Sequence, residues 1–317
     1  MQIEFYNPSF ESIWDNFVEN SLNGTFLHTR RYLSYHRERF EDVSVLLKDE
    51  NNKLVGLFPA AVDPNSKQRV VSHPGITYGG ILHTGKLRGA LMVRAIAELK
   101  NYYAERNFEA LRYKVVPNIY HRFPAADDLY ALFVHDAIRY RCDLSCAIDL
   151  RNRLEPSSRR RRSLKKALKF GITADESPRF AKDLWSVLEE NLANKYKARP
   201  VHSIAEIMRL QSLFPEQIKF VAGLLEKRVV AGVVLFLTEV VAHVQYIASS
   251  QLGYETSALD EVFKHCIEAA INDGKQWFDF GTSNEDNGRK LNESLYNFKS
   301  EFGGGGVVHE FYEMSLR

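Results

Sequence analysis

The sequence predicts a mixed α/β protein, with α+β mixed sheets, built from two copies of one folding unit. Strand-like and helix-like stretches alternate along the whole chain, and the order of the elements in the first half recurs in the second. The polar stretch DLRNRLEPSS, residues 149–158, separates the halves. A chain of 317 residues is long enough for two domains of ordinary size, which we place at residues 1–152 and 153–317.

In the first half, alternating apolar residues predict strands, and apolar residues at helical spacing predict helices. Glycine and proline interrupt one of the strands, in RVVSHPGITYGGIL. The predicted elements are, in order, a strand at 1–6, helices at 10–20 and 30–40, a hairpin at 43–62, the interrupted strand at 69–82, a helix at 86–107, a strand at 108–117, and a helix followed by a strand within 129–150.

The second half repeats this order. Its long apolar stretch from 218 to 248 is divided by turns into three strands, and the burst WFDF forms a further short strand. The predicted elements are a strand at 172–176, helices at 180–196 and 204–213, the three strands within 218–248, a helix at 256–273, the strand at 277–280, a helix at 288–299 and strands within 307–316.

Composition narrows the class of protein. Hydrophobic residues make up 45% of the chain and charged residues 26%, which is typical of a globular protein, and the net charge of +2 does not indicate a general nucleic-acid binder. We find no signal-peptide pattern and no apolar run near the ~20 residues of a membrane span, so we expect a cytoplasmic protein. Cys142, Cys146 and Cys266 lack metal-ligand spacing; we expect reduced thiols and no metal.

A basic run stands out against this modest net charge. SSRRRRSLKKALKFG, residues 157–171, carries seven positive charges and no acid. Three uses are open: a solvated helix face, an anchor for the phosphates of a coenzyme or nucleotide, or a nucleic-acid surface. No aromatic residue lies between the arginines, as a platform for stacking bases would require.

Three stretches resemble a known family. They are RRRRSLKKALKFGI (159–172), FDFGTSN (278–284) followed by LYNFKSEFGG (295–304), and SHPGITYGGI (72–81). Together with the element order, they resemble the GNAT acyltransferases. A tandem pair of such units resembles the Fem-type peptidyltransferases and the acyl-CoA-dependent N-acyltransferases of nucleotide-linked sugars. The resemblance implies two tandem GNAT-like domains with a ligand cleft between them, the first being the acceptor platform and the second binding the acyl donor.

The resemblance also implies where coenzyme A binds. In the family, the fourth and fifth strands splay apart and their backbone groups bind the pantetheine arm, while the following helix N-terminus takes the pyrophosphate. Here Glu255 intrudes with an unfavourable charge on the usual glycine-rich pattern. The residues expected to bind the acyl-CoA are Tyr246, Ile247, Ala248, Ser249, Gln251, Gly253, Thr256, Ser257, Ala258, Asn284 and Lys299.

Direct aminolysis of a thioester needs a neutral amine and a polarised carbonyl, without a covalent nucleophile. Candidate catalytic groups near the expected loops are His73, His121, Tyr78 and Glu285. Candidate acceptor-binding residues are Gly75, Tyr78, Tyr120, Arg122 and His202. Residue chemistry alone does not rank these candidates, because each histidine also suits a structural role.

The leading functional hypothesis is an N-acyltransferase that moves an acyl group from acyl-CoA directly to an amine. The family resemblance points to the amino group of a nucleotide-linked deoxyamino sugar, used for surface polysaccharide in a bacterium. One alternative is a Fem-type peptidyltransferase that uses aminoacyl-tRNA on cell-wall precursors, although the second half lacks the heptad stretch of a coiled-coil arm. Another is a non-catalytic nucleic-acid-binding protein. The expected partners of the enzyme are small molecules, with no nucleic acid and no membrane insertion.

Overall fold

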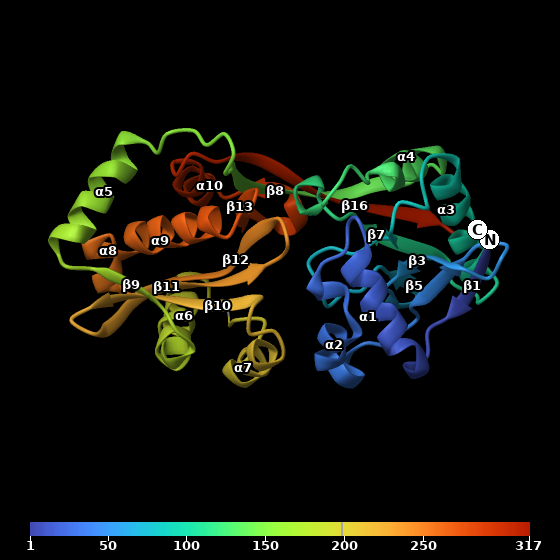
Figure 1. Cartoon of the computed structure of the whole chain (residues 1–317), viewed down its shortest axis with the longest axis horizontal. Coiled ribbons are helices and arrows are strands. Elements are labelled where there is room, and N and C mark those ends of the chain that lie inside the picture. The colour runs from blue at the N-terminus through green and yellow to red at the C-terminus, as the bar shows by residue number, and fades with distance from the viewer. Residues whose placement is uncertain (198) are drawn as a thin grey trace. The chain divides into compact units, whose positions relative to one another are not determined.

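The chain forms two compact units, shown in Figure 1. The computed structural model describes residues 1–197 and 199–317. Unit 1 comprises Met1–Leu144, Asn284–Lys290 and Val308–Arg317, and unit 2 comprises Ser145–Ser283 and Leu291–Val307. The strands β8 (Ile138–Asp149) and β16 (Gly305–Ser315) therefore have residues in both units.

Unit 1 contains two sets of strands. An antiparallel sheet has the order β1-β2-β3-β6, and the second set has the order β4-β5-β7-β16-β8, in which β5 and β7 are parallel. The strand bounds are β1 Gln2–Phe5, β2 Val45–Lys48, β3 Leu54–Phe58, β4 Ala61–Asp63, β5 Ser66–Val71, β6 Leu82–His83, β7 Ala110–Lys114 and, in the segment that returns late in the chain, β14 Asn284–Glu285.

Helices bury these strands. The helix α3 directs Met92, Ala95, Ile96, Leu99 and Tyr103 into one core at helical spacing, together with apolar residues of β2, β3 and β7. The helices of unit 1 are α1 Glu11–Asn20, α2 Arg30–Leu33, α3 Ala90–Ala104 and α4 Asp127–Val134, with 3-10 turns at Pro8–Phe10, Phe26–His28, Ser34–Arg39, Asn118–Tyr120 and Asp286–Gly288.

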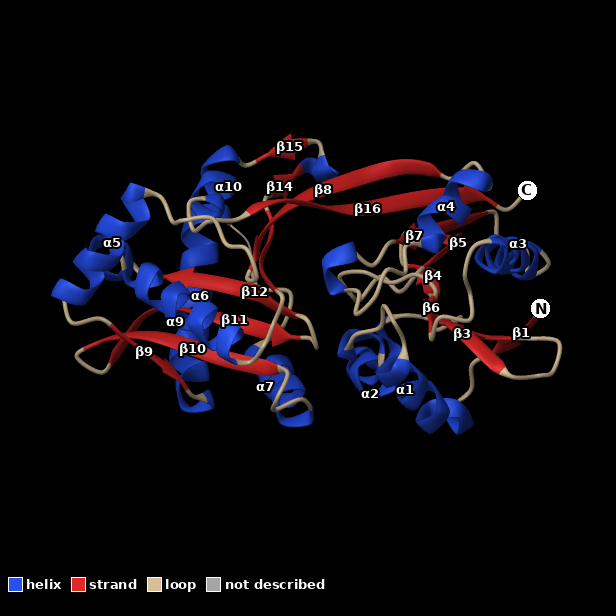
Figure 2. Cartoon of the chain, turned by 45° about the horizontal axis from the view of Figure 1, so that its top comes forward, coloured by secondary structure: helices blue, strands red, loops and turns tan. Residues whose placement is uncertain are grey.

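Unit 2 is built on one sheet with the strand order β8-β13-β12-β11-β10-β9. All neighbours are antiparallel except β12 and β13. Figure 2 shows the helices over this sheet. The bounds are α5 Ser158–Lys169, β9 Thr173–Glu176, α6 Ala181–Tyr196, α7 Ile204–Leu213, β10 Ile218–Leu225, β11 Arg228–Leu237, β12 Val241–Ser249, α8 Gln251–Thr256, α9 Ala258–Asn272, β13 Trp277–Thr282 and α10 Glu293–Ser300, with a 3-10 turn at Pro178–Phe180. The two-residue strand β15, Lys290–Leu291, pairs with β14 and has one residue in each unit.

Two glycines show that α6 and α9 cover opposite faces of this sheet. Gly232 pairs with Ala222, whereas Gly223 is the next residue of β10 and therefore points to the other face. A Cβ on Gly232 would lie 2.7 Å from Leu184 of α6, and a Cβ on Gly223 would lie 2.8 Å from Val262 of α9. Each glycine lets one helix approach the strands closely.

The structure differs from the predicted elements in several places, and the helix expected at 288–299 begins only at Glu293, after the strand β15. The helix expected at 30–40 is only α2 followed by the 3-10 turn Ser34–Arg39, and the strands expected within 307–316 are the single strand β16. The helix expected at 256–273 is α9, and a further short helix, α8, precedes it; Ser257, between the two, adopts a left-handed conformation with φ 59°. A left-handed residue ends one helix and lets the next begin in a new direction.

The return of the chain to unit 1 was also not visible in the sequence. Residues Phe311–Ser315 of β16 pair with β7, and Met314 is buried in the core of unit 1.

Among the described residues, no helix is both long and apolar enough to cross a membrane. In residues 1–197 and 199–317, no group of three or more His, Cys, Asp or Glu side chains is arranged to hold a metal ion.

Candidate functional site

The strands β12 and β13 run in parallel for only three residue pairs and then part. The pairs are Val241 with Trp277, Ala242 with Phe278, and His243 with Asp279. Beyond Asp279, β13 pairs only with β8, through Thr282 and Ser145, while β12 continues to Ser249 alongside β11. In the described part of the chain, the remaining edge of β12 therefore has no strand partner on this side. Such an edge can bind an extended ligand through its backbone.

A β-bulge lies on β12 immediately after this point. Val244 pairs with Leu235 and Tyr246 with Val234, so Gln245 is an extra residue on β12. The extra residue puts Val244 and Ile247 on the same face, where both contact the core under α9. Tyr246 points to the opposite face, where its ring lies 5.2 Å from that of Trp185 of α6.

A cavity of about 470 Å³ lies where β12 ends and α9 begins. Its wall comes from five parts of unit 2: α5, α6, the end of β12, the junction of α8 and α9, and α10. The lining residues are Arg159, Arg160, Ser163, Asn191, Ile247, Ser249, Gly253, Tyr254, Ser257, Leu259, Asp260, Asn292, Ser294, Leu295 and Phe298.

The junction that forms the cavity depends on Gly253. A Cβ there would lie 2.3 Å from the carbonyl oxygen of Val230, so only glycine lets α8 pack this closely against β11. Ser250 caps α8 by accepting a hydrogen bond from the amide of Gly253 at 3.2 Å. At the start of α9, Ser257 makes no side-chain cap. The first turn of α9 therefore presents backbone donors and a partial positive charge beside the cavity.

The basic helix α5 brings charge to the same cavity. Arg160 is buried and its Nη1 lies 3.1 Å from Oδ1 of Asp260, while its Nε lies 3.1 Å from Oε2 of Glu301. Burial raises the pKa of Asp260 to about 6, although Arg160 opposes the rise. Arg159 is mostly exposed and lies 3.6 Å from Glu301, so it is the cavity-lining guanidinium that a solvent-borne anion reaches most readily.

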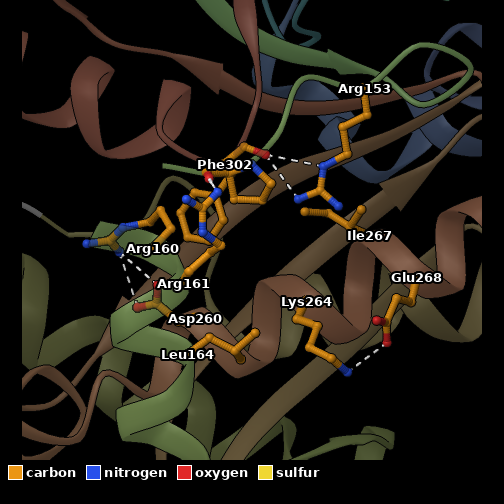
Figure 3. A pocket seen from close by; sticks show the side chains of 10 residues that line it. Arg153, Arg160, Arg161, Leu164, Asp260, Lys264, Ile267, Glu268 and Phe302 are labelled. Atoms are coloured by element: carbon orange, nitrogen blue, oxygen red, sulfur yellow. Dashed lines mark hydrogen bonds and ion pairs between the residues drawn. The ribbon is translucent and has the colours of Figure 1, made fainter. Parts of the chain in front are cut away.

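A second cavity, of about 210 Å³, lies on α5 and α9 (Figure 3). Its charged side chains are engaged with one another or with the backbone. Lys264 pairs with Glu268 at 2.9 Å, and Nη2 of Arg153 donates to the carbonyl of Phe302 at 3.0 Å. The larger cavity, beside the parting strands, is therefore the better candidate for a ligand.

Three polar side chains meet where β12 and β13 part. Nδ1 of His243 lies 2.9 Å from Oδ2 of Asp279, and Oδ1 of Asp279 accepts hydrogen bonds from the hydroxyl of Ser145 and from the amide of Gly281. Asp279 is fully buried, whereas the side chain of His243 is 13% exposed. A carboxylate at Nδ1 favours the tautomer that leaves a lone pair on Nε2. This arrangement orients an imidazole to accept a proton.

Neither His243 nor Ser145 is among the residues predicted from the sequence, in which Asp279 is only the end of a strand. A signal was present, because His243 is a polar residue between Ala242 and Val244 in an apolar strand. An isolated histidine in a strand is usually structural, so the pattern alone could not identify the pair. The third residue lies 134 positions from Asp279 in the chain.

The residues expected to bind the acyl-CoA fall into two groups. Ile247, Ser249, Gly253 and Ser257 line the larger cavity. The others are placed away from its wall, and their contacts are as follows: Tyr246 with Trp185, Ala248 buried in the sheet, Gln251 donating to Glu255 at 3.0 Å, Thr256 donating to Leu252 O at 2.8 Å, and Ala258 buried in the core.

Lys299 has a different environment from the one expected. It is buried on α10, and its Nζ donates to the carbonyls of Gly281 and Thr282 at 2.8 Å each. These carbonyls follow the last β12–β13 pair, so the lysine supplies donors at the point where β13 leaves β12. Burial lowers the pKa of Lys299 to about 8.

Asn284 and Glu285 belong to the segment of the chain that is part of unit 1. The side-chain amide of Asn284 accepts from the backbone amide of Leu144 and donates to the carbonyl of Gly288 at 3.2 Å. Glu285 is exposed and pairs with Lys290 at 2.8 Å. Both side chains thus take part in contacts that shape this segment.

In unit 1, His73 and Tyr78 are buried and Gly75 is half-buried. The His73 ring is 5.3 Å from that of His36, and burial lowers the pKa of His73 well below its usual value. Gly75 packs so closely that a Cβ would lie 2.4 Å from His36. The rings of Tyr78 and Tyr120 are 4.5 Å apart.

His121 and Arg122 contact the backbone of unit 1. Nε2 of His121 lies 2.9 Å from the carbonyl of Val116, and burial lowers the pKa of His121 to about 4. Nη1 of Arg122 donates to the carbonyl of Glu19 at 2.6 Å. His202, the remaining candidate, lies in unit 2, where its Nδ1 is 2.6 Å from the Tyr246 hydroxyl.

Comparison with known proteins identifies the fold. Residues 151–299 match the family model of the acetyltransferase (GNAT) domain. The structure is similar to that of FemX, with a TM-score of 0.70 and 11% identity over 99% of this chain and 97% of that chain. It is also similar to a conserved protein of unknown function from Bacteroides thetaiotaomicron VPI-5482, with a TM-score of 0.66 and 11% identity over 100% of both chains.

A tandem GNAT protein from the clavulanic acid biosynthesis pathway superposes with a TM-score of 0.54 and 10% identity, over 100% of this chain and 99% of that chain. No curated protein matches the sequence. The parting strands, the bulge and the helix that follows lie within the matched residues 151–299. The chain therefore has the tandem fold of the GNAT superfamily, and its residues 151–299 match the model of the GNAT acetyltransferase domain.

Proposed function

We propose that the protein is an N-acyltransferase that transfers an acyl group from acyl-CoA directly to an amine. One observation carries the proposal: β12 and β13 part after His243 and Asp279, and the free edge of β12 leads to a cavity of about 470 Å³ at the start of α9. An extended thioester arm fits a strand edge, and a pyrophosphate fits a helix N-terminus beside a cationic helix.

The residues present fit such a donor. Val244–Ser249 would bind the arm, and the first turn of α9 with Arg159 would bind the phosphates. Glu255, which the sequence suggested would oppose an anion, accepts from Gln251 and is not part of the cavity wall. Asp260 does line the cavity, but Arg160 is paired with it at 3.1 Å. When bound, the acyl-CoA supplies an acyl group activated as a thioester.

His243 is the general base of this proposal. Its Nε2 takes the proton of the amine that attacks the thioester carbonyl, and the carboxylate of Asp279 stabilises the imidazolium that results. The imidazolium returns this proton to the thiolate of coenzyme A, which leaves when the carbon–sulfur bond breaks. Ser145 and the amide of Gly281 hold the carboxylate in place. His243 thereby takes the role that the sequence assigned to His73 or His121, which are largely buried and whose pKa values burial lowers.

For the acceptor we propose the amine of a nucleotide-linked deoxyamino sugar. The support is the family resemblance; the rings of Tyr78 and Tyr120, which the sequence offered for ring contact, are buried against each other in unit 1. Two further cations of unit 1 are engaged by its own groups: Arg112 pairs with Glu313 at 2.7 Å, and Lys114 donates to the carbonyl of Ile76.

A second candidate is a Fem-type transferase that takes its acyl group from aminoacyl-tRNA. The likeness to FemX over nearly the full length of both chains favours it, and the exposed cations of α5 suit a polyanionic donor. This reaction shares the amine acceptor chemistry but not the coenzyme A donor.

One assay separates the two candidates. Acyl-CoA donors of different chain length are mixed with a panel of dTDP- and UDP-linked amino sugars, and release of free thiol is followed. We expect turnover with at least one sugar, and a rate lowered by roughly two to four orders of magnitude in His243→Gln. Silence across the panel, together with transfer from aminoacyl-tRNA, would replace the first proposal by the second.

A further inference from the structure

The helix α5 presents a row of cations to solvent. Arg160 and Ala167 are its buried residues and define its inner face. Arg162, Lys165, Lys166 and Lys169 follow the spacing i, i+3, i+4, i+7 on the opposite side, and all four are exposed. Figures 1 and 2 both show α5 at the margin of unit 2.

These four cations lack ion-pair partners in the part of the chain that the structure describes. Elsewhere on the same helix the pattern differs, because Arg159 and Arg160 are both near Glu301. Like charges three and four residues apart repel one another and weaken a helix. An anionic partner would relieve this repulsion and stabilise the helix. The row is therefore complementary in charge to an anionic surface.

Two apolar side chains lie beside the row. Leu168 is 52% exposed and Phe170, directly after the helix, is 51% exposed. A hollow in the surface is lined by Lys165, Lys166, Lys169 and Phe170. A bilayer surface offers phosphate groups in the headgroup layer and apolar chains just below it. The lysines can contact the phosphate groups, and the exposed phenylalanine can contact the apolar chains.

We propose that the end of α5 docks the protein on the surface of an anionic lipid bilayer. Lys165, Lys166 and Lys169 contact headgroup phosphates, and Leu168 and Phe170 enter the boundary between headgroups and acyl chains. The attachment is peripheral and reversible. It is independent of the proposed acyl transfer and adds a membrane surface to the three uses of the basic run that the sequence left open.

The apolar pair favours a bilayer over a nucleic acid. RNA or DNA would be bound by the cations, and Phe170 could stack on a base, but the aliphatic side chain of Leu168 would gain little from a phosphate backbone. A bilayer surface uses Leu168 and Phe170 alike. The contribution of Leu168 therefore distinguishes the two partners.

The test is co-sedimentation of the full-length protein with vesicles of phosphatidylcholine alone or mixed with phosphatidylglycerol, over a series of salt concentrations. We expect binding only to the mixed vesicles, weakening as salt rises. The triple variant K165E/K166E/K169E should lower the partition coefficient by about a hundredfold or more. The variant L168S/F170S should lower it by roughly tenfold.

The matched control is K53E/K67E/K86E, which makes the same change in net charge at three exposed lysines of unit 1. It should alter vesicle binding by less than about twofold. Thermal unfolding checks that each variant is folded. Equal binding to neutral vesicles, no binding to mixed vesicles, or an unchanged partition coefficient in K165E/K166E/K169E would overturn the proposal.

A competition experiment addresses the other partner. Transfer RNA is added to protein bound to mixed vesicles, and the affinity of the RNA for the protein is measured for the wild type and for Leu168→Ser. If L168S binds vesicles as tightly as the wild type while RNA displaces both, α5 is a nucleic-acid surface and the proposal is wrong. A loss of vesicle binding in L168S with unchanged RNA affinity supports the bilayer.

Discussion

Nδ1 of His243 lies 2.9 Å from Oδ2 of Asp279 at the last residue pair that joins β12 to β13. The pair thus lies at the point where the strands part, and the free edge of β12 continues from it to the cavity at α9. A buried carboxylate behind a partly exposed imidazole is an arrangement that orients a base. The reaction centre we propose is therefore beside the end of the donor arm.

Replacing Asp279 by Asn tests this pairing. The amide keeps the shape of the side chain but removes the charge that stabilises protonated His243, so we expect the turnover number to fall by about 10²- to 10⁴-fold. The dissociation constant for coenzyme A should not change, because Asp279 is fully buried. Steady-state kinetics combined with calorimetry separate the two quantities.

Ser145→Ala is the control for this prediction. It removes one of the hydrogen bonds to Asp279 but leaves the carboxylate and the amide of Gly281. We expect a smaller loss of turnover than in Asp279→Asn. A loss equal to that of Asp279→Asn would mean that position, rather than charge, matters, and full activity in Asp279→Asn would exclude the pair from the chemistry.

Gly253→Ala tests the packing of α8 against β11. The added methyl group would lie 2.3 Å from the carbonyl of Val230 and 2.5 Å from Oγ of Ser249, so the helix must shift. We expect unfolding to become easier by about 1–3 kcal/mol and coenzyme A to bind more weakly. Gly305→Ala is the matched control, since nothing lies within 4 Å of its added Cβ. Equal thermal midpoints for the two variants would contradict the packing described.

Lys114 predicts a pH dependence of stability. Burial lowers its pKa from 10.5 to about 7 in the folded state. Between about pH 7 and pH 10, Lys114 is protonated in the unfolded chain but not in the folded chain. The destabilisation by Lys114 is therefore complete below about pH 7 and becomes progressively smaller as the pH rises through this window. In this window its contribution to the free energy of unfolding should rise by up to about 1.4 kcal/mol per pH unit.

Lys114→Met removes that contribution. Denaturant unfolding across the window gives the free energy of unfolding of both proteins. The value for the Met variant minus that for the wild type should be largest near pH 7 and should decrease as the pH rises. Parallel pH profiles for the two proteins would show that Lys114 keeps an ordinary pKa on folding.

Truncation after Val307 tests the division of the chain. It removes Val308–Arg317, including the strand residues that pair with β7 and the buried side chain of Met314. We expect unit 1 to lose its protection against limited proteolysis, while fragments of unit 2 remain resistant. Resistance of unit 1 equal to that of the full chain would show that its core does not need β16.

The sequence was sufficient for the element order and for part of the wall of the larger cavity, because both depend on local patterns. The apolar runs of β10, β11 and β12 and the glycine before α9 are contiguous signals, and they led to Ile247, Ser249, Gly253 and Ser257, which line the cavity. The left-handed conformation of Ser257 was not predictable, since serine has no strong preference for it.

Non-local contacts account for what the sequence did not provide. Ser145 and Asp279 meet only because β8 and β13 pair, and the two arginines of α5 lie near Glu301 only because α5 packs close to the end of α10. The burial of His73 likewise depends on His36, which comes from another element. A candidate base chosen by neighbouring glycines could not take this burial into account.

The central claim is that acyl-CoA binds unit 2 at the cavity beside α9, and titration calorimetry with coenzyme A tests it most directly. Arg159→Glu and Arg162→Glu make the same charge change on the same helix, but only Arg159 lines the cavity. We predict that the wild type binds one coenzyme A, that Arg159→Glu weakens binding by about tenfold or more, and that Arg162→Glu has a much smaller effect. Absence of binding to the wild type, or equal affinities for the two variants, would contradict the account.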